Sequence, residues 1–203
     1  YKIKTVENKH THLVPEELEQ LERLSLTDKH MKLQKSLDAF LFCCYAGMRY
    51  SDFTNLSKKN IVDINQETWL IYKSVKTGTE VRLPLYLLFA GKGIVILNKY
   101  RNNLEDFFRL RDNSNINKDL IIIAKLAGLS KKISFHTARH TNATLLIYNG
   151  VNITTVQKLL GHKSVKTTQV YTNIMDMTIV HDLEKIKQAA LGIKKKTDNS
   201  FNK

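Results

Sequence analysis

The sequence predicts an α+β fold that is mainly helical and contains one small antiparallel sheet. Along most of the chain, apolar residues recur at helical spacing, and single glycines separate these segments. One region, residues 61–84, changes to short runs of β-branched and aromatic residues around a glycine. The sequence has no internal repeat and no low-complexity segment, which is compatible with a single domain.

Two helices and a helical turn are expected in the first quarter of the chain. The first helix runs from Glu16 to Leu26, because Pro15 suits its first position and leucines form one apolar face. The second runs from about His30 to Met48, where apolar spacing indicates a buried core helix. A short turn over Ser51–Leu56 follows.

A β-hairpin is expected next. Thr68–Tyr72 and Glu80–Leu83 are short strand candidates on either side of residues 76–79. Gly78 in this segment marks a hairpin turn, and Pro84 ends the second strand.

The second half of the chain predicts a series of helices. After a mixed helical pattern over 86–111, helices are expected over Asn117–Ala127 and within Ser134–Tyr148. Asn152 is expected to cap a further helix that runs to Leu160 and is ended by Gly161. Two more helices are expected over Lys166–Tyr171 and about Ile174–Leu191. In the last one, apolar residues at four-three-four spacing form a seam that needs a partner. These seam residues are Ile179, Leu183, Ile186 and Ala190.

The charge of the chain points to a polyanionic partner. The 203 residues include 32 Lys and Arg against 19 Asp and Glu, for a formal net charge of +13. Residues 29–181 carry 22 of the basic and ten of the acidic residues, so the surplus lies in the folded part. Nucleic acid is the first candidate partner, and an anionic membrane surface is the second. No apolar run approaches the ~20 residues of a membrane span.

The two cysteines, Cys43 and Cys44, are adjacent. They cannot form an ordinary disulfide that closes a long loop, so a reducing, intracellular setting is expected.

Four separated stretches carry the candidate chemistry. They are Ala46–Asp52 (AGMRYSD), Lys76–Gly78 (KTG), His136–His140 (HTARH) and Leu159–His162 (LLGH), with Tyr171 nine residues after the last. Arginines are scarce, seven against 25 lysines, yet two of them lie in these stretches. The combination resembles the catalytic domain of tyrosine recombinases, the phage-integrase family, and the resemblance runs from about Leu13 to Ile186.

The resemblance implies a site-specific DNA recombinase, an integrase of a mobile element, that acts through a covalent 3′-phosphotyrosine intermediate. It implies double-stranded DNA as the partner and the bacterial cytoplasm, in association with DNA, as the location. Cationic side chains would neutralise the transition-state charge, so neither a metal ion nor ATP is expected. The sequence also lacks the clustered carboxylates of a two-metal nuclease.

Family resemblance implies the following roles for the catalytic residues. Tyr171 attacks the phosphorus, and Arg49 and Arg139 hold the two non-bridging oxygens with their paired N–H groups. His162 adds a donor to the same oxygens.

Further roles concern proton transfer and support. Lys76 is the implied general acid for the leaving 5′ oxygen, and His136 is the implied base or hydrogen-bond acceptor near the tyrosine hydroxyl. Asp52 matches an acidic position that supports Arg49, and His140 matches a supporting position.

Single residues of this set have ordinary alternatives. Lys73 competes with Lys76 for the hairpin role. His136 and His140 have the spacing of a metal-binding pair, but Thr137 stands where a metalloprotease would carry its glutamate.

Two other functions remain open at this point. A type IB topoisomerase uses similar chemistry and would relax supercoils without joining two sites. A non-catalytic basic DNA-binding module would form no covalent adduct.

The resemblance also divides the chain. Residues 1–12 are expected to be a linker arm from a preceding DNA-binding domain, 13–192 the catalytic domain, and 193–203 a flexible basic tail. Because recombination exchanges two duplexes, a tetramer on DNA is expected. The apolar seam predicts that the helix over about Ile174–Leu191 docks on a neighbouring protomer.

Overall fold

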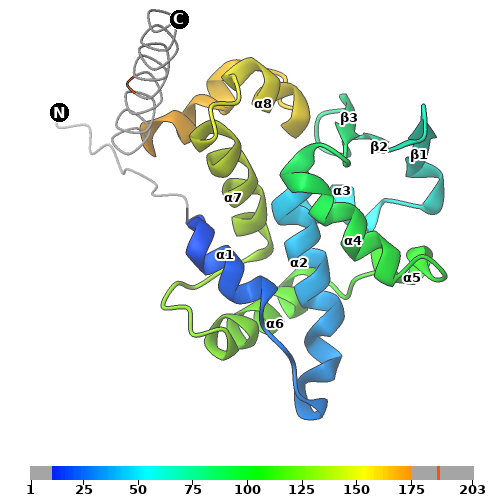
Figure 1. The fold of residues 1–203 in the computed structure, drawn as a ribbon, viewed down its shortest axis with the longest axis vertical. Helices are drawn as coiled ribbons and strands as arrows, with labels where there is room; N and C mark the ends of the chain where they lie inside the picture. Colours follow the sequence, from blue (N-terminus) through cyan, green and yellow to red (C-terminus); the bar gives the residue numbers. More distant parts are fainter. Residues whose placement is uncertain (1–10, 175–186, 188–203) are drawn as a thin grey trace, which may run out of the picture.

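The structure is a computed structural model that describes residues 11–174 and residue 187. The α-helices of this part are α1 (Pro15–Glu22), α2 (Gln34–Ala46), α3 (Tyr50–Thr54), α4 (Lys92–Lys99), α5 (Leu104–Phe108), α6 (Asn113–Leu126), α7 (Phe135–Tyr148) and α8 (Ile153–Leu160). The 3₁₀ helices are η1 (Asp28–Leu33), η2 (Lys58–Asn60), η3 (Leu88–Gly91), η4 (Val165–Thr167) and η5 (Gln169–Ile174). The strands are β1 (Ile61–Ile64), β2 (Glu67–Lys73) and β3 (Glu80–Pro84). This confirms the predicted fold class (Figure 1).

Helix α2 forms the centre of the core. Every residue from Ser36 to Ala46 is buried, including the unpaired cysteines Cys43 and Cys44. Figure 1 shows α2 between α7 and α4, and α1 and α6 contact it as well. The single α-helix predicted from about His30 to Met48 is instead a 3₁₀ helix followed by α2, which is closed by Gly47 with φ 67°.

The sheet has the order β1-β2-β3 and is antiparallel throughout. The two predicted strands are confirmed as β2 and β3, but the sequence analysis did not find β1. Strands β1 and β2 are joined through Asn65 and Gln66, whose φ angles are 53° and 67°. Two consecutive left-handed residues are typical of the tightest hairpin turns, where glycine is common. Because neither residue is a glycine here, the turn carried no clear sequence signal.

Side-chain caps explain where two later helices begin. The carboxylate of Asp112 accepts a hydrogen bond from the N–H of Asn115 at 3.1 Å, so α6 starts before the expected Asn117. Asn152 caps α8 as predicted, because its side-chain oxygen accepts from the N–H of Thr154 at 2.9 Å. The predicted helix over about Ile174–Leu191 lies outside the described residues, except for residues 174 and 187.

A single aromatic ring anchors the short helix α3. Phe53 is fully buried, and its ring packs edge-on against Phe42, Phe107 and Phe108, with centroids 5.4–5.9 Å apart. Such pairs stabilise a core beyond the area that they bury. The anchor therefore fixes the position of Arg49, the residue that precedes α3.

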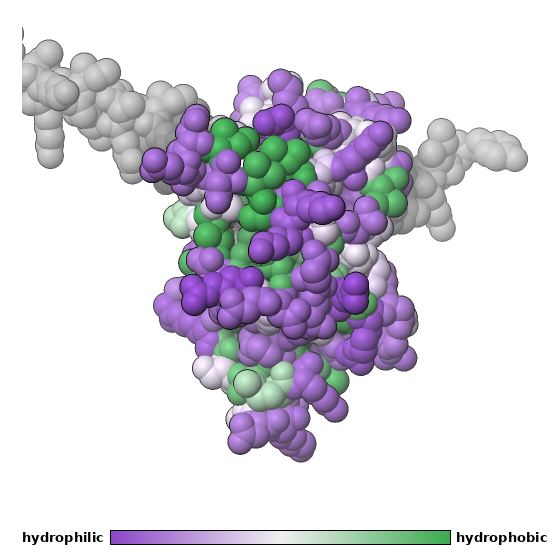
Figure 2. Space-filling model, turned by 90° about the vertical axis from the view of Figure 1, so that its right-hand side faces the viewer, coloured by the Kyte–Doolittle hydropathy of each residue, from purple (hydrophilic) through white to green (hydrophobic). Residues whose placement is uncertain are grey.

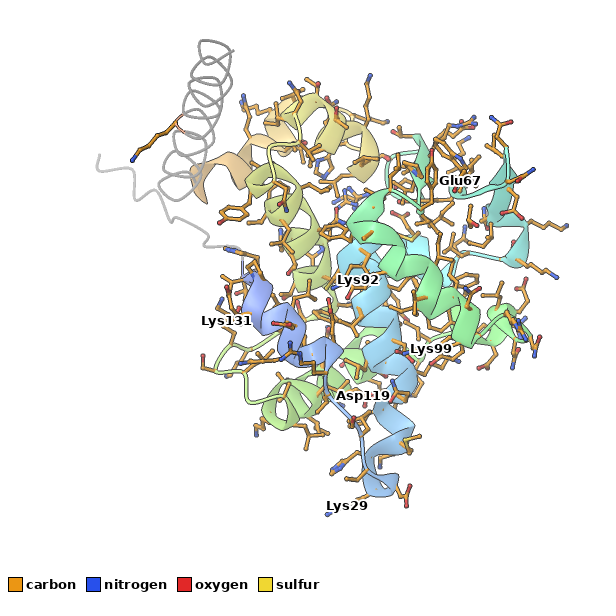
Figure 3. All side chains as sticks on the ribbon, viewed as in Figure 1. Lys29, Glu67, Lys92, Lys99, Asp119 and Lys131 are labelled. Atoms are coloured by element: carbon orange, nitrogen blue, oxygen red, sulfur yellow. The ribbon has the colours of Figure 1, made fainter. Side chains whose placement is uncertain are left out.

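Polar contacts fasten the segment before α1 to the rest of the fold. The Nζ of Lys131 donates to Glu17 at 2.7 Å and to the carbonyl of His12 at 3.2 Å, and Figure 3 shows Lys131 beside α1. The backbone N–H of Leu13 donates to the hydroxyl of Thr141 on α7 at 2.9 Å. The entry to α1 is thus tied directly to α7.

Polar side chains cover most of the face in Figure 2, the side of the molecule that carries the sheet, with apolar patches between them. Exposed large apolar side chains include Val75, Leu87 and Val95. No helix in the described part of the chain has the length and apolar character needed to cross a membrane.

Replacing Gly47 by Ala is expected to destabilise the fold by about 3 kcal/mol or more. The new Cβ would lie 2.6 Å from Oδ1 of Asn142 and 2.8 Å from a methyl carbon of Leu160, at a positive φ. Gly128→Ala is the matched control, because Gly128 has φ +76° but no atom near the added Cβ; it should cost only about 1–2 kcal/mol. Denaturant unfolding of both variants measures the difference, and equal losses would contradict the packing explanation.

Candidate active site

Arg139 is a buried charge that joins the ends of two helices. It lies on α7 and is 1% exposed. Its Nη1 donates to the carbonyl of Gly47 at 2.7 Å, and its Nη2 donates to the carbonyl of Leu160 at 2.7 Å. These carbonyls belong to the C-terminal ends of α2 and α8, where the helix dipoles are negative and favour a cation. Gly47 and Gly161, both with positive φ, end the two helices there.

Arg49 places a second positive charge near that of Arg139. Burial, followed by the charge of Arg49, lowers the pKa of Arg139 to about 10. Arg139 therefore keeps its proton at neutral pH, close to another guanidinium. Two neighbouring cations of this kind favour an anionic ligand that both can reach.

Asp52 holds Arg49 in place and also holds the β2–β3 turn. Nη1 of Arg49 lies 3.4 Å from the Asp52 carboxylate and donates to Oγ of Ser74 at 3.3 Å. Asp52, which is 1% exposed, accepts from the Ser74 hydroxyl at 3.2 Å and from the N–H of Val75 at 2.8 Å. Asp52, for which the resemblance implied a supporting role, thus contacts both Arg49 and the β2–β3 turn.

The turn that carries Lys76 is tied at its far side to α8. The hydroxyl of Thr77 donates to the carbonyl of Gly161 at 3.1 Å. Lys76 itself is exposed, and Lys73, its competitor in the sequence analysis, is exposed at the end of β2. The charge of Lys76 contributes to the lowered pKa of His162, after burial and the charges of other residues. Of these two lysines, Lys76 is therefore the one whose charge acts on His162.

His162 follows α8 and is held by Thr168. Its Nδ1 lies 2.8 Å from the Thr168 hydroxyl, and the ring is largely buried. Burial, followed by the positive charges of Arg139 and Arg49, lowers its pKa to about 4. The ring is therefore neutral at neutral pH, and Thr168 contacts it through Nδ1 and not through Nε2.

Tyr171 lies in η5 and is 5% exposed. Its hydroxyl is 3.1 Å from Nδ1 of His140. The ring of His136 packs edge-on against that of His140, with centroids 4.4 Å apart, and His136 is exposed. The sequence analysis expected His136 at the hydroxyl; the structure places His140 there.

The charges of Arg49 and Arg139 also affect the pKa of Tyr171. Burial raises the pKa of Tyr171 above its usual range, while the charges of Arg139 and Arg49 act in the opposite direction. The phenol is protonated at neutral pH, so an attack by this oxygen requires a proton acceptor.

The predicted residues therefore meet in one region. The charge of Arg49 lowers the pKa of Arg139, and the charges of both arginines lower the pKa of His162. His136 and Lys76 make smaller contributions to the lowered pKa of His162. The sequence analysis missed the residues that hold this set, Ser74, Thr168 and the carbonyls of Gly47 and Leu160. Hydroxyls and backbone carbonyls of this kind have no recognisable spacing, so no pattern could have found them.

Among the described residues, no three His, Cys, Asp or Glu side chains gather as metal ligands would.

A cleft lies beside Tyr171. The segment from His12 to Glu16 forms one wall, and α7 forms another through residues that include Thr144 and Tyr148. The hydroxyl of Thr144 is buried and has no hydrogen-bond partner in the described part of the chain. The tyrosine thus stands between the charged residues and a mainly apolar hollow.

Acidification is expected to destabilise the wild type through His162. Its folded pKa of about 4 lies below the usual value of 6.5, so the unfolded chain binds the proton more tightly. The free energy of unfolding that His162 contributes is complete above about pH 7, and it is lost as the pH falls through 6.5 toward 4. Urea unfolding of wild type and His162→Gln between pH 7.5 and 4.5 measures it. The wild type should lose more stability than the variant, and parallel curves would rule the explanation out.

The chain is similar in sequence and in fold to known proteins. A tyrosine recombinase of Pseudothermotoga lettingae is 30% identical over 181 residues, which cover 87% of this chain and 60% of that protein. The crystal structure of XerA recombinase matches with a TM-score of 0.68 and 25% identity, over 86% of this chain and 64% of that one.

A lambda integrase tetramer bound to a Holliday junction shares the fold, with a TM-score of 0.62, 19% identity and coverage of 83% of this chain and 48% of that one. The chain spans about half to three fifths of the length of the relatives that it matches. The model of the phage integrase family matches residues 12–177. Because this match covers most of the chain, the chain belongs to the phage integrase family.

Proposed function

We propose that this chain cleaves and rejoins DNA at specific sites through a covalent 3′-phosphotyrosine, with Tyr171 as the nucleophile. The observation that carries the proposal is the buried Tyr171 hydroxyl, which contacts an imidazole and lies within the field of two arginines. Arg49 and Arg139 are cations close enough for one to lower the pKa of the other. A DNA phosphodiester supplies the negative charge that such a pair favours.

In the proposed step, the Tyr171 oxygen forms a bond to phosphorus, and the bond from phosphorus to the 5′ oxygen breaks. The phenol proton passes to the His136–His140 pair, through the His140 nitrogen that the hydroxyl already contacts. Lys76 gives a proton to the leaving 5′ oxygen. Rejoining is the reverse reaction, in which a 5′ hydroxyl displaces the tyrosine. The number of phosphoester bonds stays the same, so ATP is not needed.

The charged residues stabilise the transition state of both steps. Arg49 and Arg139 hold the non-bridging oxygens, and neutral His162 donates through Nε2. Preorganised donors of this kind contribute ~3–4 kcal/mol each in other enzymes. Arg139 is well suited to this role, because its hydrogen bonds at 2.7 Å fix the guanidinium before any substrate arrives.

We further propose that the reaction is recombination, carried out by the integrase of a mobile element in the bacterial cytoplasm. The related protein of Pseudothermotoga lettingae is named a tyrosine recombinase. A Holliday junction, to which the lambda integrase tetramer is bound, joins two duplexes, which strand exchange requires and supercoil relaxation does not.

Tyr171→Phe is expected to abolish the covalent adduct and to leave DNA binding within about twofold. Phe keeps the ring that packs near His140 but has no oxygen to attack phosphorus. The assay mixes the chain with a pool of nicked suicide duplexes of randomised sequence and separates the adduct on a denaturing gel. Tyr148→Phe, the same change at another tyrosine of the neighbouring cleft, is the control that should keep the adduct. An adduct in the Tyr171→Phe protein would refute the assignment.

The catalytic unit is proposed to extend over residues 13–192 and to work as a tetramer on DNA. Leu13 is fully buried and bonded to α7, which supports the start of this unit. We propose that the apolar seam of Ile179–Ala190, which lies outside the described residues apart from residue 187, docks on a neighbouring protomer. The lambda integrase complex is itself a tetramer on DNA.

Removing the residues after Asn173 is expected to lower cooperative assembly on DNA, because the seam would lose its partner surface. Gel-shift titrations of the truncated and full chains should show the higher-order complex only with the full chain, while the first bound complex forms with both. A chain truncated after Gly192 is the control and should assemble normally. Equal assembly by both truncated chains would mean that the seam is not needed between protomers.

A further inference from the structure

Strand β2 carries a buried tyrosine to the edge of the candidate site. Tyr72 lies on this central strand, opposite Val81 of β3, and is 5% exposed. Ser74, two residues later, binds both Arg49 and Asp52. Strand β2 ends at Lys73, but the N–H of Ser74 donates to the carbonyl of Thr79 at 2.9 Å, so the pairing continues for one more residue. Because side chains alternate along such a paired segment, Tyr72 and Ser74 share one side, and Ser74 contacts Arg49 there.

The hydroxyl of Tyr72 has no hydrogen-bond partner in the described part of the chain. A buried hydroxyl without a partner costs about 1–3 kcal/mol, and most buried polar groups avoid this cost. Phenylalanine would fill the same space without the penalty. The Tyr72 hydroxyl is therefore a polar group that costs stability in the described structure.

The charges around Tyr72 are those of the candidate site. Burial and the Asp52 carboxylate raise its pKa above the usual range, while Arg139 and Arg49 act in the opposite direction. The hydroxyl therefore lies within electrostatic reach of the carboxylate and of both guanidinium groups.

The hydrogen bonds of the two arginines differ in length. Those of Arg139 measure 2.7 Å, whereas those of Arg49 to Asp52 and Ser74 measure 3.4 and 3.3 Å. Arg49 is the more weakly held of the two and the easier one to draw toward a phosphate. If Arg49 turns away, Asp52 loses its cation and keeps the bonds from Ser74 and Val75.

We propose that Tyr72 is a positioning residue that donates its unused O–H to Asp52 when Arg49 turns to the DNA phosphate. This inference rests on the proposed function. The new hydrogen bond replaces the contact that Asp52 gives up, so the carboxylate keeps its hold on the β2–β3 turn. Arg49 then moves to the phosphate without releasing the turn that carries Lys76.

The test is Tyr72→Phe, measured without DNA and during adduct formation. Without DNA, the melting temperature should stay equal or rise, because an unpartnered hydroxyl is removed. With an excess of protein over the nicked duplex pool, the single-turnover rate of adduct formation should fall by tenfold or more. The protein concentration that half-saturates the DNA should change less than threefold. A structural role would instead move stability and rate together in the same direction.

Tyr45→Phe is the matched control, since it removes the hydroxyl that donates to Glu22 of α1 at 2.6 Å. It should lower the melting temperature and leave the rate unchanged. The inference is overturned if the Tyr72→Phe rate stays within twofold of wild type. It is also overturned if the rate falls only together with the melting temperature. If the wild type forms no adduct, the proposed function fails and this inference fails with it; if the wild type reacts, only the inference is at stake.

Discussion

The structure depends on one buried guanidinium. Arg139 is almost fully enclosed in the core, and a charge in that position requires compensation. The compensation comes from two carbonyls at the ends of α2 and α8. One belongs to Gly47, which has left-handed backbone, and the other belongs to Leu160, which is followed by the left-handed Gly161. The two helix ends must therefore meet at one point on α7. Arg49 follows one of these ends and His162 follows the other, so the position of Arg139 determines where both can stand.

The guanidinium of Arg139 stabilises the fold and is also proposed to bind the phosphate. Each Nη nitrogen of Arg139 carries two N–H groups and uses a hydrogen bond to hold a helix end, and its remaining capacity can face a ligand. Lysine offers three donors around one point and cannot span two separate carbonyls in this way. The need for arginine follows from the backbone that it holds, as well as from the phosphate that it is proposed to bind.

Patterns that the sequence displays directly were read correctly. The β2–β3 hairpin, the cap at Asn152 and the helix end at Gly161 each depend on neighbouring residues. Strand β1 was missed because its turn uses Asn65 and Gln66 in a conformation more common for glycine. The extra length of α6 depended on the cap at Asp112. The motif residues were found through family resemblance, whereas the contact of His140 with the Tyr171 hydroxyl depends on how η5 packs against α7. No local pattern encodes such long-range packing.

The β2–β3 turn is exposed, yet both of its sides are bound to the parts that hold the arginines. Val75 is bonded to Asp52, which contacts Arg49, and Thr77 is bonded to Gly161, which follows the carbonyl that holds Arg139. Surface loops usually tolerate changes in length. An insertion between these two attachment points would have to lengthen the turn without moving either arginine. The length of this loop is therefore expected to be under stronger evolutionary constraint than its exposure suggests, and protein engineers would find it a poor place to insert a tag.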